Sequence, residues 1–314
     1  MEFLATADAN TNANENGQTK PVESITFLSY NVGLLRLKML GMTLFSNPPY
    51  AKERLPFIPE GIKSVHADIV AIQECYEDKH AEYLIAALKE MYPYHARMNS
   101  GGVFRFHNGL MLFSKFPIKN CTLQAYKKVS SLEYYMATKS SLIVDVDIPG
   151  LGVVTLVNMH TTAGGHIDPE HPDADSDRED ELRQAYDVCA AVEAEGRLAI
   201  ILGDLNCGPE ASAGNFKYIL DKGFRDTYIE GQQRGKLLDG PEFTWDPKNF
   251  LNTLGPHKDC PGQRCDHVLL PINGMENWNV DKIHVIFSES IAPIGNSKSS
   301  TLSDHHGLIV QITK

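Results

Sequence analysis

The chain has 314 residues and a mass of 34.9 kDa, and 42% of its residues are hydrophobic, which is ample for a substantial core. Its 29 basic residues against 40 acidic residues give a formal charge of −11 at pH 7. Proteins that bind nucleic acid mainly through its phosphates normally carry a basic surface, so this balance argues against that class. It is compatible with a magnesium enzyme, because carboxylates are the ligands that magnesium prefers.

The N-terminal residues 1–22 are expected to form a disordered tail, because 6–20 are rich in Asn, Ala, Thr and Glu and cannot bury apolar surface. We expect no secretory signal, since no basic segment precedes an apolar one, and no membrane span. The six cysteines lack metal-binding spacing. A Cys260–Cys265 disulfide is one alternative, and free thiols in a reducing compartment are the other. The free-thiol alternative predicts a cytoplasmic protein, at most peripherally attached to membranes.

Beyond the tail, apolar segments alternate with polar loops and helical patterns. The expected strands cover 25–30, 69–73, 110–113, 141–146, 153–159, 198–202, 266–270 and 308–312. Several of these runs are continuously apolar, as in strands covered on both faces. Helical spacing of apolar residues appears in 77–91 and 179–195. No linker or repeat interrupts this pattern, so 23–314 is expected to be a single layered domain with strands inside and helices outside.

Polar side chains follow these apolar strands at the point where each strand ends. They are Asn31, Glu74, His160, Asp204 with Asn206, and, just before the last strand, Asp304 with His305. Each one alone has an ordinary explanation as a turn or solvated residue. Together they are what strand ends converging on one site would carry, with oxygen ligands for magnesium and two imidazoles able to move protons.

Five blocks in this order resemble the endonuclease/exonuclease/phosphatase superfamily of metal-dependent phosphodiesterases. They are Ser29-Tyr30-Asn31-Val32, Ile72-Gln73-Glu74, Val157-Asn158-Met159-His160, Gly203-Asp204-Leu205-Asn206 and Ser303-Asp304-His305. The resemblance extends over 24–314. It implies an α+β fold, a DNase-I-like four-layered αββα sandwich in which two packed mixed sheets are flanked by helices.

The resemblance also implies roles for these residues. It makes Glu74 the main Mg²⁺ ligand, with Asn31 beside it and Asp304 near a second ion, and Mn²⁺ or Co²⁺ as substitutes. His305 would be the general base, oriented by Asp266 in the block Arg264-Cys265-Asp266-His267-Val268. The same resemblance makes His160 and Asn206 donors to the charged transition state, and Asp204 either a ligand or an aid to the leaving group.

Two further segments are similar to neutral sphingomyelinases. They are 108–118, which begins Asn-Gly and ends Ser-Lys-Phe-Pro-Ile, and 243–249, Phe-Thr-Trp-Asp-Pro-Lys-Asn. They predict substrate contacts for Asn108 and Trp245, and Lys139 is a third candidate for contact with the phosphate. The ordinary explanations are a strand before a proline turn, a core Trp, and a solvated lysine at a strand start.

These similarities predict a sphingomyelin phosphodiesterase that works on phospholipid at a membrane surface, without a stable nucleic-acid partner. The apolar segment 34–45 is too short to span a bilayer, and is expected to be either an interfacial element or a buried helix. A nuclease or phosphatase of the same superfamily is the main alternative. A catalytically silent binding protein is the alternative of another class.

Most of the negative charge lies in one segment. Residues 168–181 hold eight acidic residues and one arginine, a net −7, which leaves −4 for the other 300 residues. The segment does not match a calcium-binding EF-hand, because Arg178 and Gln184 stand where Gly and Glu are required. It is expected to be either a solvated loop leading into a helix N-terminus or a lid that repels polyanions near the site.

Overall fold

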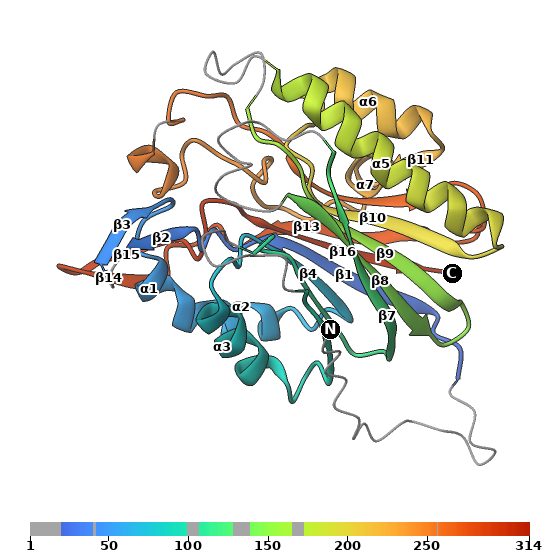
Figure 1. The fold of residues 1–314 in the computed structure, drawn as a ribbon, viewed down its shortest axis with the longest axis horizontal. Coiled ribbons are helices and arrows are strands. Elements are labelled where there is room, and N and C mark those ends of the chain that lie inside the picture. Colours follow the sequence, from blue (N-terminus) through green and yellow to red (C-terminus); the bar gives the residue numbers. More distant parts are fainter. Residues whose placement is uncertain (1–19, 40–41, 99–106, 128–138, 165–172, 256) are drawn as a thin grey trace.

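The structure is a computed structural model that describes residues 20–39, 42–98, 107–127, 139–164, 173–255 and 257–314. Figure 1 shows two sheets packed face to face, with helices covering both outer faces. The predicted αββα sandwich is therefore confirmed. Most of the predicted tail, residues 1–19, lies outside the described part. Val22, which was assigned to that tail, donates its N–H to the carbonyl of Pro149 at 2.9 Å and packs against the core.

The first sheet has six strands and both parallel and antiparallel pairs. Its order is β13 (Asn279–Ile286), β16 (Gly307–Thr313), β1 (Ser24–Asn31), β4 (Ile69–Gln73), β6 (Met111–Ser114) and β5 (Tyr94–Ala96). The central strand β1 runs parallel to β4 and antiparallel to β16. As a result, the carboxyl ends of β1 and β4 lie at the same edge as the start of β16.

The second sheet is also six-stranded and mixed. Its order is β11 (Phe224–Asp226), β12 (Asp266–Pro271), β10 (Leu198–Asp204), β9 (Gly152–His160), β8 (Ser140–Ile148) and β7 (Ile118–Ala125). β9 and β10 are parallel, with His160 opposite Asp204, and β12 pairs antiparallel with β10, with Asp266 opposite Asp204. This register alone brings three of the predicted site residues to one edge.

Alternation of side chains explains why these strands are apolar along their whole length. In β1, Ile25 and Phe27 join the core between the sheets, whereas Leu28 and Tyr30 join the layer under the first helices. β10 divides in the same way between the inter-sheet core and a third cluster under the other helices. These two strands are buried on both faces, as their composition predicts.

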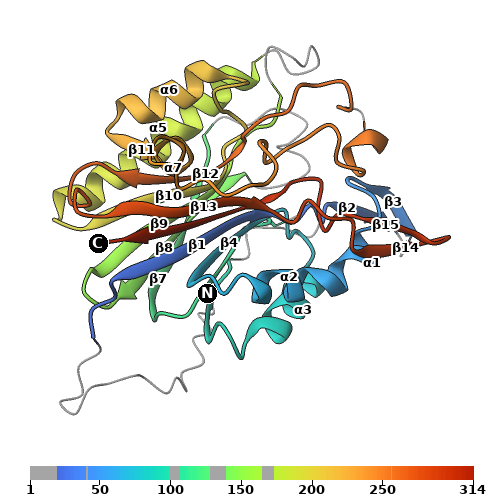
Figure 2. The same ribbon diagram turned by 180° about the vertical axis from the view of Figure 1, so that it is seen from behind.

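Helices form the two outer layers. α1 (Ala51–Arg54), η1 (Leu55–Phe57), α2 (Ile58–Ser64) and α3 (Asp78–Leu88) cover the first sheet, and α5 (Ala174–Ala194) and α6 (Ala213–Asp221) cover the second. Figure 2 shows the same separation from behind. α7 (Thr227–Gln233) packs on β12 and β13, and η2 (Asn252–Leu254) lies in the loop before β12. None of the helices in the described ranges is long and apolar enough to cross a membrane.

All eight predicted strands and both predicted helices are present, but one predicted alternative is wrong. The segment 34–45 is not a buried helix: β2 (Arg36–Met39) and β3 (Met42–Ser46) form an antiparallel hairpin. A second hairpin joins β14 (Ala292–Gly295) to β15 (Lys298–Ser300), and both lie at the same end of the molecule (Figures 1 and 2). Residues 40 and 41 at the first hairpin tip lie outside the described part.

For the acidic segment and the cysteines, the structure gives detail that the sequence left open. α5 begins at Ala174, five residues before the expected helix, so Asp175 and Asp177 occupy its first turn, where acids are favourable. Glu181 is fully buried, whereas residues 168–172, the predicted loop or lid, lie outside the described part. All six cysteines are free thiols, so the Cys260–Cys265 disulfide is not formed.

Candidate active site

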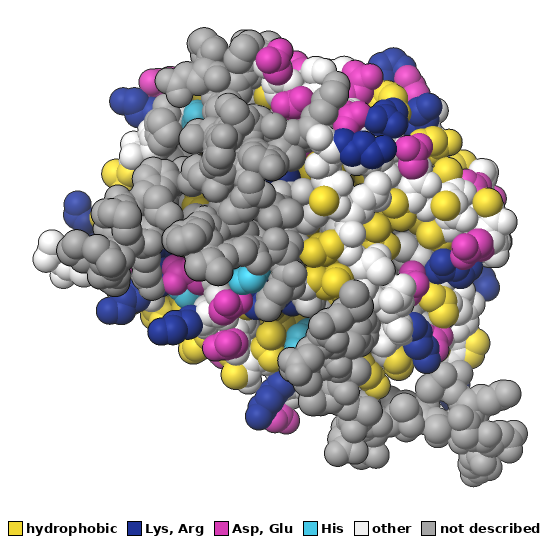
Figure 3. All heavy atoms as spheres, in the orientation of Figure 1, with side chains coloured by type: hydrophobic (Ala, Val, Ile, Leu, Met, Phe, Trp, Pro, Cys, Tyr) yellow, Lys and Arg dark blue, Asp and Glu magenta, His cyan; other side chains and the backbone are white. Residues whose placement is uncertain are grey.

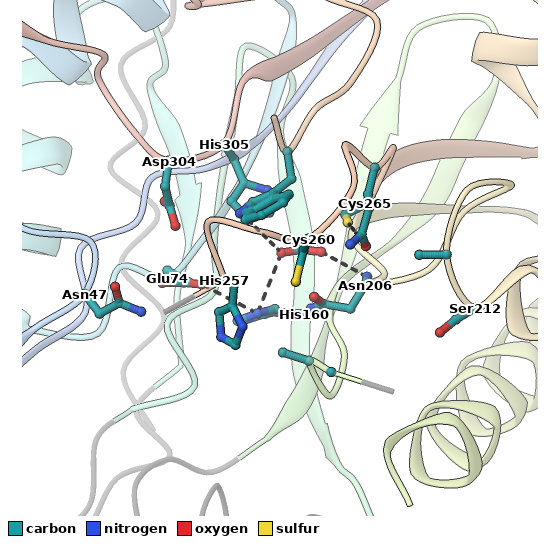
Figure 4. A pocket seen from close by; sticks show the side chains of 16 residues that line it. Asn47, Glu74, His160, Asn206, Ser212, His257, Cys260, Cys265, Asp304 and His305 are labelled. Atoms are coloured by element: carbon teal, nitrogen blue, oxygen red, sulfur yellow. Dashed lines mark hydrogen bonds and ion pairs between the residues drawn. The ribbon is translucent and has the colours of Figure 1, made fainter. Parts of the chain in front are cut away.

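The predicted strand-end residues converge on one pocket. A cavity of about 200 Å³ is lined by Glu74 after β4, His160 at the end of β9, Asp204 at the end of β10 with Asn206 after it, and Asp304 and His305 before β16. Figure 4 shows Asp304 and His305 across the pocket from Glu74 and His160. Both sheets therefore contribute residues to one pocket, and the strand ends converge there as the sequence predicts.

Asn31 links the carboxylates at the floor of the site. Its amide nitrogen donates to Glu74 Oε1 at 3.0 Å and to Asp204 Oδ2 at 2.9 Å, and its Oδ1 accepts the N–H of Gly33 at 3.0 Å. Asn31 thus faces the carboxylates with its donor nitrogen. Its predicted role as an oxygen ligand stays a prediction.

Two site residues adopt left-handed backbone. Glu74 has φ 61° and Asn206 has φ 45°. Asn tolerates this region, whereas for Glu it costs roughly 1–2 kcal/mol, which the surrounding structure must offset. The turn aims the Glu74 carboxylate toward Asn31. Such strain at a site residue is typical of functional positions.

The acidic side chains of the site carry more negative charge than the nearby cationic side chains neutralise. Burial and the nearby charge of Asp304 raise the pKa of Glu74 to about 7. Oxygen or nitrogen atoms of Glu74, His160 and Asp204 lie within 4.8 Å of one another. In addition, Asp266 Oδ1 is buried and has no hydrogen-bond partner among the described residues. Crowded carboxylates with few protein cations fit a hard divalent cation, which is bound by oxygen ligands.

Asp266 and His305 form a buried pair. His305 Nδ1 lies 2.9 Å from Asp266 Oδ2, and its Nε2 faces the pocket 3.7 Å from Asp204 Oδ2. Burial lowers the pKa of His305, but the charges of Asp266 and Asp204 outweigh it and raise this pKa well above its ordinary value. The carboxylate on one nitrogen holds the ring so that the other nitrogen can exchange a proton in the pocket.

His160 faces both carboxylates and is oriented from behind by a tyrosine. Its Nε2 lies 3.7 Å from Glu74 Oε1 and 3.8 Å from Asp204 Oδ2, while its Nδ1 lies 3.4 Å from the hydroxyl of Tyr76. Gly109, with φ 74°, leaves room for the Tyr76 ring, because a Cβ there would approach it to 2.9 Å. Sequence reasoning missed Tyr76, although its position two residues after Glu74 was a usable signal.

Asn206 and Lys139 meet at one backbone carbonyl. Asn206 Nδ2 donates to the Thr161 carbonyl at 3.1 Å, and Lys139 Nζ donates to the same oxygen at 2.9 Å. Lys139 is 8% exposed and is not one of the lining residues, so the structure places it behind the pocket wall. Its predicted contact with substrate stays a prediction. In the structure, Lys139 instead holds the chain segment that follows His160.

The other two predicted substrate residues lie in different places. Trp245 lines the pocket, and its N–H and carbonyl pair with those of Gln263. Asn108 is 6% exposed, and its Oδ1 accepts the N–H of Leu110 at 2.9 Å, so it shapes the turn before β6. The pocket also has lining residues that were not predicted. They are Asn47, Ala163, Gly164, Ala211, Ser212, His257, Cys260, Gln263 and Cys265.

The segment 243–249 and the nearby Asn252 anchor the two chain segments that carry Asp266 and Asp304. Thr244 Oγ1 accepts the N–H groups of Cys265 and Asp266 at 3.0 and 3.1 Å. Asn249 Nδ2 donates to the Ser303 carbonyl at 2.9 Å, and Asn252 Nδ2 donates to the Asp304 carbonyl at 2.9 Å. Thr244 and Asn249 belong to the segment that was noticed as a sequence similarity, whereas Asn252 lies just beyond it, and the positioning role of all three was not foreseen.

Below the pocket, a polar pair connects the two sheets. Gln73 Nε2 on β4 donates to Asn158 Oδ1 on β9 at 2.8 Å, and Asn158 Nδ2 donates to the carbonyls of Ile72 and Met111 at 3.0 Å each. All are buried. Because unsatisfied polar groups are costly in a dry interior, this bonding holds the two strand ends in one relative position.

Comparison with known proteins agrees with this geometry. The family model described as the Endonuclease/Exonuclease/phosphatase family matches residues 28–305. The chain belongs to this family. No protein among the curated sequences matches it. The family's members act on phosphodiester bonds, so the pocket of this Endonuclease/Exonuclease/phosphatase protein is a candidate phosphodiesterase site.

Several solved structures share the fold. Sphingomyelinase C from Streptomyces griseocarneus superimposes with a TM-score of 0.73 at 20% identity, covering 92% of this chain and 99% of that one. Beta toxin from Staphylococcus aureus, a mutant with bound magnesium ions, has a TM-score of 0.71 at 18% identity and covers 91% and 99%. Truncated TDP2 from Caenorhabditis elegans has a TM-score of 0.67 at 19% identity and covers 93% and 98%. At these identities the likeness establishes the αββα fold of this family member.

Proposed function

We propose that the protein is a magnesium-dependent phosphodiesterase that hydrolyses sphingomyelin to ceramide and phosphocholine. The proposal depends on the charge of the pocket. Its described lining residues include the acids Glu74, Asp204 and Asp304, three histidines and Trp245, but no lysine or arginine. Nucleic acids and inositol polyphosphates need cations for their additional phosphates, whereas a zwitterionic head group needs none. The quaternary ammonium of choline is instead attracted by aromatic faces, which Trp245 offers.

The surface charge supports the same choice. On the face in Figure 3, lysine and arginine side chains are interspersed with acidic ones and do not gather into a single basic patch. A protein of net charge −11 repels a polyanion at low salt. We therefore expect no stable nucleic-acid partner.

The roles of the residues follow from their positions. The chemistry that Mg²⁺, or Mn²⁺ or Co²⁺ in its place, would supply when bound is neutralisation of the phosphate oxygens and polarisation of the phosphorus. Glu74 and Asp204 are the residues that would hold it, with Asp304 on the opposite wall. His305, oriented by Asp266, takes a proton from the attacking water. His160 donates to an oxygen that gains charge as the bond breaks.

The β2–β3 hairpin is proposed as the element that contacts the lipid surface. Its register pairs Leu37 with Phe45 and Met39 with Met42. The hairpin base is joined to the active site, because Leu34 N–H donates to the Glu74 carbonyl at 3.2 Å and Asn47, just after the hairpin, lines the pocket. A short apolar element with basic residues suits the head-group region of a bilayer. The six free thiols support a cytoplasmic location for this peripheral enzyme.

The experiment that tests the substrate is a turnover panel with Mg²⁺. Sphingomyelin, lysophosphatidylcholine, plasmid DNA and an inositol polyphosphate are compared for the wild type, for Glu74→Gln and after metal removal with EDTA. We expect phosphocholine release from sphingomyelin, abolished by EDTA and by Glu74→Gln, and no nicking of the plasmid. Cleavage of DNA alone would make the protein a nuclease, and no turnover on any substrate would favour a silent binding protein.

The lipid contact is tested separately with a Leu40→Asp, Phe45→Asp double variant. We expect weaker binding to sphingomyelin vesicles and unchanged hydrolysis of a soluble chromogenic diester, because the hairpin touches the membrane and not the reacting atoms. Leu238→Asp, at a residue that is 42% exposed beside β13, is the matched control and should bind vesicles normally. Equal loss on both substrates would instead assign the hairpin to the folded core.

A further inference from the structure

Two arginines, Arg54 and Arg178, are the largest fully buried side chains among the described residues. Arg54 is the last residue of α1 and lies next to the loop that follows β1. Its Nε donates to the Pro49 carbonyl at 3.0 Å, one Nη to the carbonyls of Val32 at 3.1 Å and Leu302 at 2.6 Å, and the other Nη to that of Gly33. All four of these bonds go to backbone oxygens.

Three of the four carbonyls that Arg54 binds belong to the loops that carry Asn31 and Asp304, and the fourth, that of Pro49, lies just before α1. Val32 and Gly33 directly follow Asn31, whereas Leu302 lies two residues before Asp304. These loops touch, because a Cβ on Gly33 would lie only 2.4 Å from Asp304 Oδ1. One planar guanidinium therefore fixes the spacing of two loops that are far apart in the sequence.

The positive charge of Arg54 also lies near the carboxylates of the site. Burial lowers its pKa, and the nearby negative charges of Asp304 and Glu74 act in the opposite direction. Burying a cation is expensive, and an apolar side chain would fill the same space at lower cost. The presence of an arginine at this buried position is therefore better explained by its interactions with the carboxylates and the two loops than by a contribution to stability alone.

We propose that Arg54 is a positioning residue for the divalent cation, which sets the Asn31 loop against the Asp304 loop before the metal binds. The proposal rests on the metal dependence proposed above, but not on the identity of the substrate. The guanidinium is suited to this role because its fork of N–H donors is rigid, so four carbonyls are held at fixed positions.

Arg178 provides a matched comparison. It is equally buried, but it forms an ion pair with Asp175 at 2.8 Å and donates to the carbonyls of Thr162 and Gly164 and to Ser212. Of these partners, Gly164 and Ser212 line the pocket, whereas Thr162 and Asp175 lie behind it. Loss of Arg178 therefore disturbs packing to a similar degree without reaching either the Asn31 or the Asp304 loop.

The test measures Mn²⁺ binding by calorimetry in the absence of substrate, for the wild type, Arg54→Lys and Arg178→Lys. Lysine keeps the charge but carries its donors on one atom. We expect Arg54→Lys to raise the Mn²⁺ dissociation constant by about tenfold or more, as loss of a residue that orients metal ligands does. Arg178→Lys should leave it within about twofold, although its melting temperature falls.

A second variant, Gly33→Ala, tests the same loop spacing with Arg54 intact, in case Arg54→Lys does not fold. Its methyl group would intrude on Asp304 and is expected to weaken Mn²⁺ binding by a similar factor. Wild-type affinity in a folded Arg54→Lys or Gly33→Ala protein, or equal weakening in the Arg178 control, overturns the positioning role. A wild type that binds no Mn²⁺ contradicts the proposed metal dependence itself.

Discussion

Two histidine–aspartate pairs meet at strand β12, and only one of them faces the pocket. Asp266 pairs with His305 at 2.9 Å, and the next residue, His267, pairs with Asp226 at 2.8 Å. Neighbouring residues of a strand point to opposite faces. Both pairs are buried, and in both the aspartate raises the histidine pKa against the opposing effect of burial.

The difference lies at the second ring nitrogen. His305 Nε2 faces the pocket near Asp204, whereas His267 Nε2 donates to the Cys207 carbonyl at 2.8 Å and its ring stacks on Phe216. A histidine bonded within the protein through both nitrogens has no site left for a substrate proton. The same pair of residue types therefore leaves a ring nitrogen open to the pocket on one face of the strand and holds the Cys207 loop on the other.

The largest effect is expected from His305→Ala. Removing the base should lower turnover by about 10²–10⁴-fold in a variant that still folds, although its melting temperature falls because Asp266 loses its buried partner. Steady-state kinetics and thermal unfolding measure the two quantities. A folded variant with near-normal turnover would remove His305 as the base and with it the distinction between the two pairs.

The second pair is broken by Asp226→Asn, which keeps the N-terminal cap of α7, where Asp226 Oδ1 accepts the Ile229 N–H at 2.8 Å. Leaving His267 buried without its carboxylate should cost about 3–5 kcal/mol of unfolding free energy near pH 6. Urea denaturation measures this loss. The folded enzyme should keep its turnover.

The sign of the pH dependence sharpens this prediction. The folded-state pKa of His267 is raised. The pair therefore contributes its full stabilisation of the folded state below the unfolded-state pKa of about 6.5. This stabilisation disappears as the pH rises through the folded-state pKa. The deficit of Asp226→Asn should therefore shrink at high pH. Asp221→Asn, which breaks an exposed pair with Lys217, is the control and should show little loss at any pH. A deficit that grows with pH contradicts a protonated His267.

The smallest effect is expected from Phe216→Leu. The Phe216 and His267 rings stack with centroids 4.8 Å apart, so losing the aromatic face should cost about 1 kcal/mol. Calorimetric unfolding measures the loss. Turnover should not change, and a clear fall in turnover without loss of stability would mean that the second pair also supports catalysis.

Sequence reasoning located the pair that faces the pocket and missed the one that does not. Asp266 and His305 stand in blocks that resemble a family, whereas Asp226 carries no motif and is separated from His267 by 41 residues. Similarly, Arg178 was noticed only as a mismatch to a calcium loop, although it is one of the largest buried side chains. Lys139 was a candidate for contact with the phosphate, and its bond to the Thr161 carbonyl was not foreseen.

The sequence by itself determined the order of the apolar strands, the polar residue at the end of each and hence the family and its αββα fold. These features are local, because burial on both faces demands a continuous apolar run and the chemistry demands particular side chains. Only the tertiary structure decided which imidazole nitrogen faces the pocket and which carbonyls the buried arginines hold. Every residue has a backbone carbonyl, so the residue types in the sequence do not indicate which carbonyl an arginine binds. That choice depends only on where the packed loops lie.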